Sequence, residues 1–418
     1  MKVLGIVAEY NPFHNGHLYH LQASRAMTGA DCVVAIMSGN YTQRGEPALV
    51  DKWARAEMAL LSGVDLVIEL PVVYAMASAE YFAFGAVRLL DSLGVVDTLC
   101  FGSEFGLINK LKQAADILFE EPEEYKTILR AYLSSGKSFP DARQKALAEY
   151  LKTKYGKDEL SELLKNPNNI LGVEYLKALR RLNSRIVPLT VGRVGNDYNS
   201  AELTGRISSA TSIRNVLSSN PWYSARELLE SCLPNTSLAV LEREAEIGRG
   251  PLFPHDFTQL LLTTLRRMTN DEIKKLPYME NGLENRIRLA VDNSATWQEL
   301  VDRIGTRRYT ATRVQRILFG ALAGLNNETL EYFTRLGGPP YIRVLGLNET
   351  GKKLLSEIRG KAALPVITKT AGHKKSTVVG VAEMLRLEAQ ATDQYVIACQ
   401  NPFMRKSGAD FTRNVVIC

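Results

Sequence analysis

Short apolar runs alternate with helix-like segments through the first half of the chain. Five runs have the length and composition of buried strands: Val3–Ala8, Cys32–Met37, Leu66–Leu70, Thr98–Phe101 and Ile186–Val191. Between these runs, apolar residues recur at helical spacing from His17, over Asp51–Ser62 and over Ala79–Leu93. Apolar strands that alternate with helices are typical of a parallel β-sheet covered on both faces. The first half is therefore predicted to be an α/β domain.

The pattern changes twice along the chain. A charged, helix-like segment, residues 107–165, precedes the last predicted strand and is expected to be a helical insertion. After Arg214 the pattern is mostly helical, and a short β element is expected near Tyr395–Ala398 and Val415–Ile417. We therefore predict an α/β domain over residues 1–215 and a mainly α-helical domain over residues 216–418.

The composition is that of an ordinary globular protein. Of the 418 residues, 45% are hydrophobic and 23% are charged. The chain has no stretch of about twenty apolar residues and no signal peptide before its first strand. Its five cysteines are odd in number and scattered, which fits a reducing compartment. We therefore expect a cytoplasmic protein without a membrane partner.

Basic charge is concentrated in one part of the chain. The net charge is +6, but residues 251–375 alone contain 20 lysines and arginines against 12 acidic residues. Such a concentration is typical of a surface that binds a polyanion such as RNA. A solvated helical surface would give the same count, so charge alone leaves both interpretations open.

A cluster of histidines follows the first predicted strand. The run Glu9-Tyr10-Asn11-Pro12-Phe13-His14-Asn15-Gly16-His17 contains a turn and then the start of a helix. A helix N-terminus offers unpaired N–H groups and a positive dipole end to a phosphate. Imidazoles add hydrogen-bond donors for charge that builds on a phosphoryl group. His14 and His17 are therefore predicted to take part in phosphate chemistry.

The same histidines allow two other interpretations. A histidine near a helix start is often structural or solvated, although here three of the five histidines fall within seven residues. A zinc site needs four ligands, and no third clustered ligand accompanies His14 and His17. No protein-bound metal is therefore expected.

A second candidate for phosphate binding follows the last predicted strand. In Ser208-Ser209-Ala210-Thr211-Ser212-Ile213-Arg214, a serine at the helix start leaves N–H groups for an anion, and Arg214 can hold a phosphate with two hydrogen bonds. A plain helix cap would explain the serines without a ligand. Ligands of parallel sheets bind outside the carboxyl ends of the strands. Residues directly after strand ends are thus expected to line one crevice: His14, Ser38, Gly39, Pro71 and Gly102.

These motifs resemble the HxGH nucleotidylyltransferase superfamily, which has a Rossmann-like nucleotide-binding domain. The run Glu9–His17, together with Ser38-Gly39-Asn40-Tyr41-Thr42-Gln43-Arg44-Gly45-Glu46-Pro47-Ala48, is more specific. The two runs resemble one bacterial family, the tRNA(Met) cytidine acetate ligases, and the resemblance covers the whole chain. The run Ser208–Arg214 is similar to the superfamily's I-S-S-T-x-I-R phosphate element. It departs from that element by Ala210 in place of threonine, with Thr211 one position later.

The resemblance implies which residues contact ATP. His14 and His17 would stabilise charge on the phosphoryl oxygens. Independently of the resemblance, Arg44 lies in a polar loop after a strand, where functional residues are common, and would orient a carboxylate or a phosphate unless it makes only a surface ion pair. A magnesium ion would bridge the phosphates. The expected ATP contacts are Val7, Ala8, Glu9, Tyr10, Asn11, Pro12, Phe13, His14, Asn15, Gly16, His17, Leu18, Tyr19, His20, Gly102, Asn168, Arg193, Ser209 and Arg214.

The densest basic run lies in the second half, from Arg307 to Phe319. Its apolar residues recur at helical spacing and would form one buried face, with Thr310 as the N-cap. An arginine stripe on the other side would follow an RNA backbone, although a solvated helix is the alternative. The predicted RNA contacts are Arg307, Arg308, Arg313 and Arg316, and the surface could extend to Arg266, Arg267, Arg286, Arg288 and Arg343.

The resemblance implies an ATP-dependent ligase. Acetate would be activated as acetyl-adenylate, and its acetyl group would pass to N4 of the wobble cytidine of elongator tRNA(Met), with release of pyrophosphate and AMP. A small-molecule adenylyltransferase of cofactor biosynthesis is an alternative, but it leaves the basic helical half unexplained. A non-catalytic RNA-binding protein is a second alternative, which the intact His14, Gly16, His17 and Arg214 disfavour.

Overall fold

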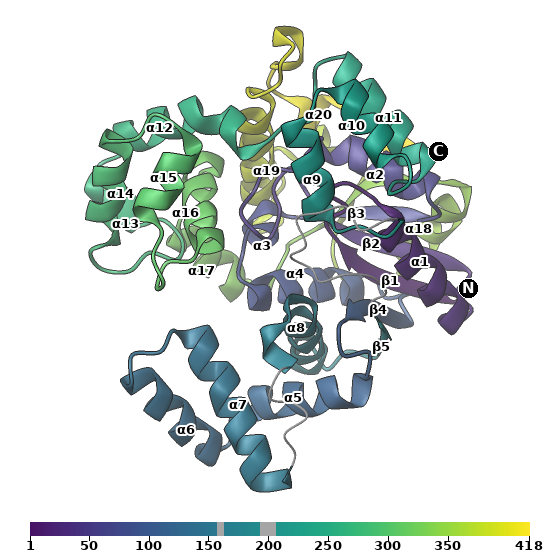
Figure 1. The fold of residues 1–418 in the computed structure, drawn as a ribbon. Helices are drawn as coiled ribbons and strands as arrows, with labels where there is room; N and C mark the ends of the chain where they lie inside the picture. The colour runs from purple at the N-terminus through teal and green to yellow at the C-terminus, as the bar shows by residue number, and fades with distance from the viewer. Residues whose placement is uncertain (157–162, 193–205) are drawn as a thin grey trace.

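One eight-stranded β-sheet organises the part of the chain that the computed structural model describes, residues 1–156, 163–192 and 206–418. Its strand order is β5-β4-β1-β2-β3-β6-β7, and β8 pairs with β6. Helices cover both faces of the sheet (Figure 1). Five strands run parallel: β1 (Val3–Ala8), β2 (Cys32–Ser38), β3 (Leu66–Leu70), β4 (Thr98–Ser103) and β5 (Val187–Gly192). The prediction of an α/β fold with these five strands is confirmed.

Alternate residues of the central strands enter two separate cores, as the two-residue repeat of a strand requires. Leu4 and Ile6 of β1 pack in the core that holds α1 (Asn15–Thr28) and α2 (Lys52–Leu61). Val3 packs in the other core, with α4 (Ala79–Ser92) and α8 (Pro167–Arg181). Because the central strands β1, β2 and β3 are covered on both faces, their ends are the places open to a ligand.

The second half of the chain adds strands to the same sheet. β6 (Ile342–Leu347) pairs antiparallel with β3, so that Leu66 lies opposite Leu347, and β7 (Val366–Ile367) and β8 (Val416–Ile417) pair with β6. β6 was not predicted, because Arg343 interrupts its apolar run. The second half is therefore mainly helical, as expected, but it shares the sheet with the first half.

The predicted β element at Tyr395–Ala398 is wrong. Tyr395 lies in the last turn of α19 (Val381–Val396), where its buried hydroxyl donates a hydrogen bond to Ala48 O over 2.7 Å. A run of four apolar residues fits a buried helix end as well as a strand, and its pattern alone could not decide between them. The predicted element at Val415–Ile417 is present as β8.

The segment 107–165 is helical, as predicted, in its described residues. It contains α5 (Ile108–Glu120), α6 (Glu123–Ser134), α7 (Phe139–Tyr155) and the short 3₁₀ helix η1 (Leu163–Lys165). Pro122 and Pro140 stand at helix starts, where the missing N–H costs nothing. In Figure 1 α6 and α7 lie side by side, away from the sheet.

The remaining helices complete the cover of the sheet and build a bundle at its side (Figure 1). No helix among the described residues is long and apolar enough to cross a membrane. Their bounds are α3 (Val72–Ala75), α9 (Ala210–Ser219), α10 (Trp222–Leu229), α11 (Asn235–Glu246), η2 (Pro254–Phe257), α12 (Thr258–Arg267), α13 (Asn270–Lys274), α14 (Leu283–Asp292), α15 (Trp297–Ile304), α16 (Ala311–Ala323), α17 (Asn327–Arg335), α18 (Glu349–Lys361), η3 (Thr370–His373), η4 (Pro402–Met404) and α20 (Ala409–Thr412).

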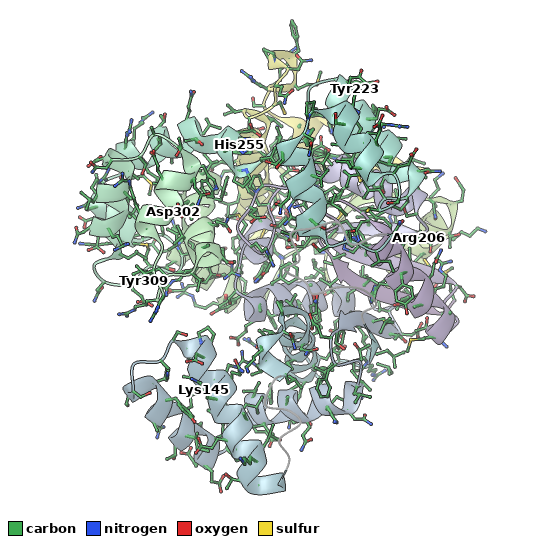
Figure 2. All side chains as sticks on the ribbon, viewed as in Figure 1. Lys145, Arg206, Tyr223, His255, Asp302 and Tyr309 are labelled. Carbon is green, nitrogen blue, oxygen red and sulfur yellow. The ribbon has the colours of Figure 1, made fainter. Side chains whose placement is uncertain are left out.

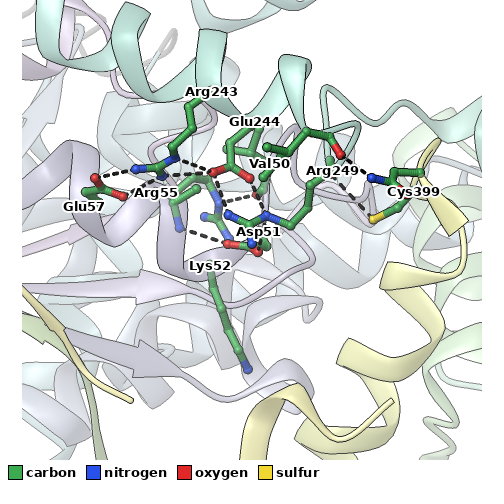
Figure 3. Close-up of polar contacts among 12 residues, drawn as sticks. Val50, Asp51, Lys52, Arg55, Glu57, Arg243, Glu244, Arg249 and Cys399 are labelled. Atoms are coloured by element: carbon green, nitrogen blue, oxygen red, sulfur yellow. Dashed lines mark hydrogen bonds and ion pairs between the residues drawn. The ribbon is translucent and has the colours of Figure 1, made fainter. Parts of the chain in front are cut away.

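Ion pairs fasten helices of the second half to α2 (Figure 3). Arg249 pairs with Asp51 over 3.4 Å, at the start of α2, and with Glu244 of α11. Arg243 of α11 holds both carboxylate oxygens of Glu57, at 2.8 and 2.7 Å. The two halves of the chain are thus joined by ion pairs, some of them with buried carboxylates, as well as by the sheet.

Candidate functional site

A cavity of about 240 Å³ lies where the parallel strands end. Its wall is formed by the end of β1 and the start of α1, the loop that follows β2, the ends of β4 and β5, part of α8 and the start of α9. This is the position at which parallel sheets bind ligands. The predicted crevice is present, and His14 and Gly102 line it. Ser38, Gly39 and Pro71, which also follow strand ends and were expected there, do not line it.

Most of the predicted contact residues line this cavity: Val7, Ala8, Glu9, Tyr10, Asn11, His14, Gly16, His17, Tyr19, His20, Arg44, Gly102, Asn168, Ser209 and Arg214. Pro12, Phe13, Asn15 and Leu18 do not line it. Asn15 instead donates hydrogen bonds from its side chain to Arg206 O and Ser231 O. Arg193 lies outside the described residues.

His14 and His17 are oriented by backbone hydrogen bonds. Nδ1 of His14 accepts from Gly16 N at 3.0 Å, and Nδ1 of His17 accepts from His14 N at 3.3 Å. Because a backbone N–H only donates, both Nδ1 atoms are unprotonated, and the proton of each neutral ring is on Nε2. The centres of the two imidazole rings are 3.8 Å apart. The motif thus holds two adjacent Nε2–H donors at the cavity wall.

The glycine between the two histidines of the motif is required for steric reasons. Gly16 lies under the His14 ring, and a Cβ at this position would be 2.8 Å from Cε1 of His14. His17 is supported from the other side by the Tyr10 ring at 5.0 Å and the Phe13 ring at 5.6 Å. Tyr10 adopts a left-handed backbone with φ 46°, which costs on the order of 1–2 kcal/mol and is sustained by its burial.

The Ser208–Arg214 element lines the same cavity as the histidines and contacts the turn before them. Ser209 caps α9 and accepts a hydrogen bond from Ser212 N at 3.0 Å. Arg214 donates to Asn11 O at 3.0 Å and lies 3.6 Å from the Glu46 carboxylate. The arginine is therefore held at the turn that leads into the histidine motif, where it can meet an anionic group.

Glu9 is a half-buried carboxyl group directly after β1. It accepts a hydrogen bond from Gln43 N at 2.6 Å, which connects β1 to the loop after β2. Burial raises the pKa of Glu9, although the Gln43 hydrogen bond and the charges of Arg214 and Arg44 act in the opposite direction. Arg44 itself lines the cavity beside Gln43.

Sequence reasoning missed an apolar wall of the cavity, formed by Ile6, Phe82, Phe101, Leu171, Tyr175, Val191 and Ile207. The Phe101 and Tyr175 rings pack 5.6 Å apart, beside Gly102. A flat apolar surface next to a glycine suits a nucleobase. In the sequence these residues have the spacing of ordinary core positions. Only the position of Phe101 and Val191 near strand ends could have identified them.

Asn168 was predicted to contact the nucleotide, and the structure places it at the edge of the cavity. Its side-chain amide donates to Glu104 Oε1 at 2.6 Å, and Asn169 N donates to Glu104 Oε2 at 2.9 Å. Glu104 therefore fixes the start of α8 against the end of β4. This carboxylate was not singled out from the sequence.

The arginine stripe on α16 is not an exposed surface, which corrects one expectation. The predicted apolar face is buried, but Arg313 donates to Tyr278 O and pairs with Glu280 at 2.8 Å. Arg316 donates from Nε to Gln43 O at 2.7 Å. Helical spacing separated these arginines from the apolar face but could not show that other segments cover them.

The other predicted basic residues are divided between surface and core. Arg307 and Arg308 are exposed, next to the labelled Tyr309 in Figure 2. Arg343, which was expected to extend the basic surface, is instead buried in β6, where it pairs with Glu69 at 2.7 Å and with Asp410. Among the described residues, no group of three or more His, Cys, Asp or Glu side chains is arranged to hold a metal ion.

Comparison with known proteins gives full-length matches. The model of the family "HIGH Nucleotidyl Transferase" matches residues 1–410. The chain is 50% identical over 417 residues to the tRNA(Met) cytidine acetate ligase of Acetivibrio thermocellus, with 100% of both chains covered. It is 42% identical to the enzyme of the same name from Halothermothrix orenii, over 100% of this chain and 99% of that one.

Two solved structures of one protein also match the full length of the chain. The chain is similar to Thermotoga maritima TmcAL bound with alpha-thio ATP, with a TM-score of 0.93 and 39% identity. An apo form of the same protein gives a TM-score of 0.95. Both matches cover 100% of this chain and 99% of the solved chain.

Proposed function

This chain belongs to the tRNA(Met) cytidine acetate ligases of the HIGH nucleotidyl transferase family, and from that membership we propose that it joins acetate to a cytidine of tRNA(Met) at the expense of ATP. The observation that carries the proposal is the meeting of His14, His17, Ser209 and Arg214 around one cavity at the strand ends. Groups that can donate hydrogen bonds to phosphate line one space there, together with an apolar wall suited to a base.

The first step would activate acetate. A carboxylate oxygen of acetate attacks the α-phosphorus of ATP, and the bond from that phosphorus to the bridging oxygen of the β-phosphate breaks. The products are acetyl-adenylate and pyrophosphate. Activation is needed because a free carboxylate is a poor acyl donor.

His14 and His17 would act on the α-phosphate. Their Nε2–H groups donate hydrogen bonds to phosphoryl oxygens, and these bonds strengthen as negative charge builds in the transition state. Such donors are effective because they are already oriented, here by the bonds of both Nδ1 atoms to backbone N–H groups. Ser209 and Arg214 would hold the β- and γ-phosphates at the start of α9.

A magnesium ion is expected to bind with ATP rather than to a site of its own. The described residues contain no cluster of three metal ligands, so phosphate oxygens and water would supply most of its coordination, as is common for this ion. When bound, it would neutralise charge on the phosphates. The protein groups that act beside it are the histidines and Arg214.

The second step would transfer the acetyl group to RNA. The exocyclic N4 of the wobble cytidine of elongator tRNA(Met) attacks the acetyl carbon, the bond from that carbon to the AMP oxygen breaks, and N4 loses a proton. We propose that the exposed Arg307 and Arg308 contact the phosphate backbone of the tRNA. The Arg308 side chain is 71% exposed, against 24% for Arg313, so Arg308 is the more accessible of the two. The reaction would take place in the cytoplasm, where its RNA substrate is found and where unpaired cysteines persist.

Labelled acetate tests the proposal. The protein is incubated with ATP, labelled acetate and tRNA(Met), and the nucleosides of the tRNA are then separated. We expect the label in N4-acetylcytidine, with equal amounts of AMP and pyrophosphate, and none in a tRNA(Met) transcript that carries uridine at the wobble position. Label in a small phosphate ester, or formation of ADP instead of AMP, would contradict the proposal.

A further inference from the structure

The loop that carries Arg44 into the cavity rests directly on α16. Gly45, at the tip of this loop, has a left-handed backbone with φ 74°. A Cβ at Gly45 would lie 2.4 Å from Arg316 N and 2.6 Å from Arg316 Cα. The backbone of the loop therefore touches the backbone of the helix, and only glycine permits so close an approach.

Side-chain contacts also hold the loop that carries Arg44 against α16. Arg316 Nε donates to Gln43 O at 2.7 Å, and its guanidinium lies 5.9 Å from the ring centre of Tyr278. The Tyr278 hydroxyl accepts from Ser78 N at 2.9 Å, while the Gln43 side chain donates to Ala77 O at 3.2 Å. The loop, α16 and the segment before α4 are thus one connected unit.

This loop carries several groups of the cavity. Thr42, Gln43, Arg44 and Glu46 line it, and the N–H of Gln43 donates to the Glu9 carboxyl group at 2.6 Å. Glu46 also lies 3.6 Å from Arg214. A shift of the loop away from α16 would therefore move groups that touch both the end of β1 and the phosphate element.

We propose that Arg316 is a positioning residue for acetate activation: by holding Gln43 O, it fixes the loop of residues 42–46 at the nucleotide cavity. The inference rests on the function proposed above. Arg316 then acts in acetate activation, although its position in a basic run predicted contact with RNA. α16 then connects the exposed residues Arg307 and Arg308, just before it, to the site of ATP chemistry.

The test separates kcat from the KM for tRNA. In Arg316→Met the hydrogen bond to Gln43 O is lost, while a side chain of similar length still packs. We expect kcat for acetate-dependent AMP formation at saturating tRNA to fall about tenfold or more, equivalent to about 1.4 kcal/mol. The KM for tRNA should stay within about twofold of the wild-type value. Arg316→Lys, which keeps the charge and one donor, should recover part of kcat.

Arg303→Met is the matched control, since Arg303 is an exposed arginine of the neighbouring α15. It should leave both kinetic constants unchanged. A kcat within twofold of wild type in Arg316→Met would overturn the inference, whether or not the KM for tRNA rises. If Arg316→Met fails to fold by its thermal melt, Arg316→Lys is judged against the same kcat criterion, with a reduced but measurable loss expected. Absence of acetate-dependent AMP formation in the wild type would refute the proposed function itself.

Discussion

Nη1 of Arg55 lies 2.6 Å from the backbone oxygen of Glu9. Arg55 is fully buried in α2, and the same guanidinium also donates to Val50 O, Ser38 O and Gly39 O. All of these acceptors are backbone carbonyls. The Arg55 side chain therefore connects the end of β1, the end of β2 and the last residues of the loop between β2 and α2. These are the segments from which the cavity is built.

Arg55→Met should destabilise the protein strongly, because it leaves buried carbonyl groups without their donor. We expect the free energy of unfolding to fall by roughly 3 kcal/mol or more. Urea denaturation measures this loss as a lower midpoint at an unchanged slope. Arg359→Met, at an exposed position of α18, is the control and should change the free energy by less than about 0.5 kcal/mol. Equal midpoints for the two variants would contradict the role given to Arg55.

His17→Ala should leave the fold intact and slow the chemistry. Loss of one oriented donor to a developing phosphoryl charge typically lowers kcat by about 10²–10³-fold. The measurement is acetate-dependent AMP formation at saturating ATP and tRNA. His255→Ala serves as the control, since His255 is exposed and does not line the cavity. If His17→Ala retained full kcat, the histidine motif would not act on the α-phosphate.

Glu388 gives the protein a predictable dependence on pH. It is buried beside a group of four charges, Lys52, Glu69, Arg343 and Asp410, and it accepts a hydrogen bond from a backbone N–H. Burial and then the charge of Glu69 raise the pKa of Glu388 well above its ordinary value of 4.5. With Glu388 protonated, the two cations and the two remaining carboxylates balance.

The sign of the effect follows from where the proton is held. Above about pH 4.5 the unfolded chain loses the proton that folded Glu388 keeps, so this group makes the folded state less stable as the pH rises toward its raised pKa. Glu388→Gln removes that contribution. The variant should therefore gain stability relative to wild type as the pH rises above about 5. Urea unfolding at several pH values measures the difference. The exposed Glu383→Gln on the same helix should follow the wild-type curve, and parallel curves for Glu388→Gln and wild type would disprove the assignment.

Replacing Arg307 and Arg308 by alanine should weaken tRNA binding without slowing acetate activation. Each phosphate contact that is lost should reduce the slope of log Kd against log salt concentration by about one. Filter binding at a series of salt concentrations gives this slope. An unchanged slope would show that the RNA follows another surface.

Much of the site could be predicted because it lies on local patterns. The strand that ends at Ala8 is a continuous apolar run, and His14 and His17 follow it at a fixed spacing at a helix start. Position at a strand end identified Gly102, and the helix-cap pattern of its run together with the family resemblance identified Ser209. Position alone was not sufficient, because Ser38, Gly39 and Pro71 also follow strand ends and do not line the cavity.

The unpredicted parts depend on contacts between distant segments. Arg55 and Arg316 lie on helices whose sequences show amphipathic spacing, but their hydrogen-bond partners are backbone carbonyls, which no sequence pattern marks. Phe82 and Tyr175 belong to helices that cover the sheet, and only the packing of those helices turns them toward the cavity. Arg343 looked like a surface residue because its buried partner, Asp410, is far along the chain.

The antiparallel strand β6 also restricts the order in which the protein can be completed during synthesis. Leu66 and Ile68 in β3 find their partners, Leu347 and Val344, only after most of the chain has left the ribosome. Until then β3, whose residues are all buried in the finished molecule, presents an unpaired apolar edge. Translation products that stop before Ile342 are therefore expected to aggregate, even though they contain every residue that lines the nucleotide cavity.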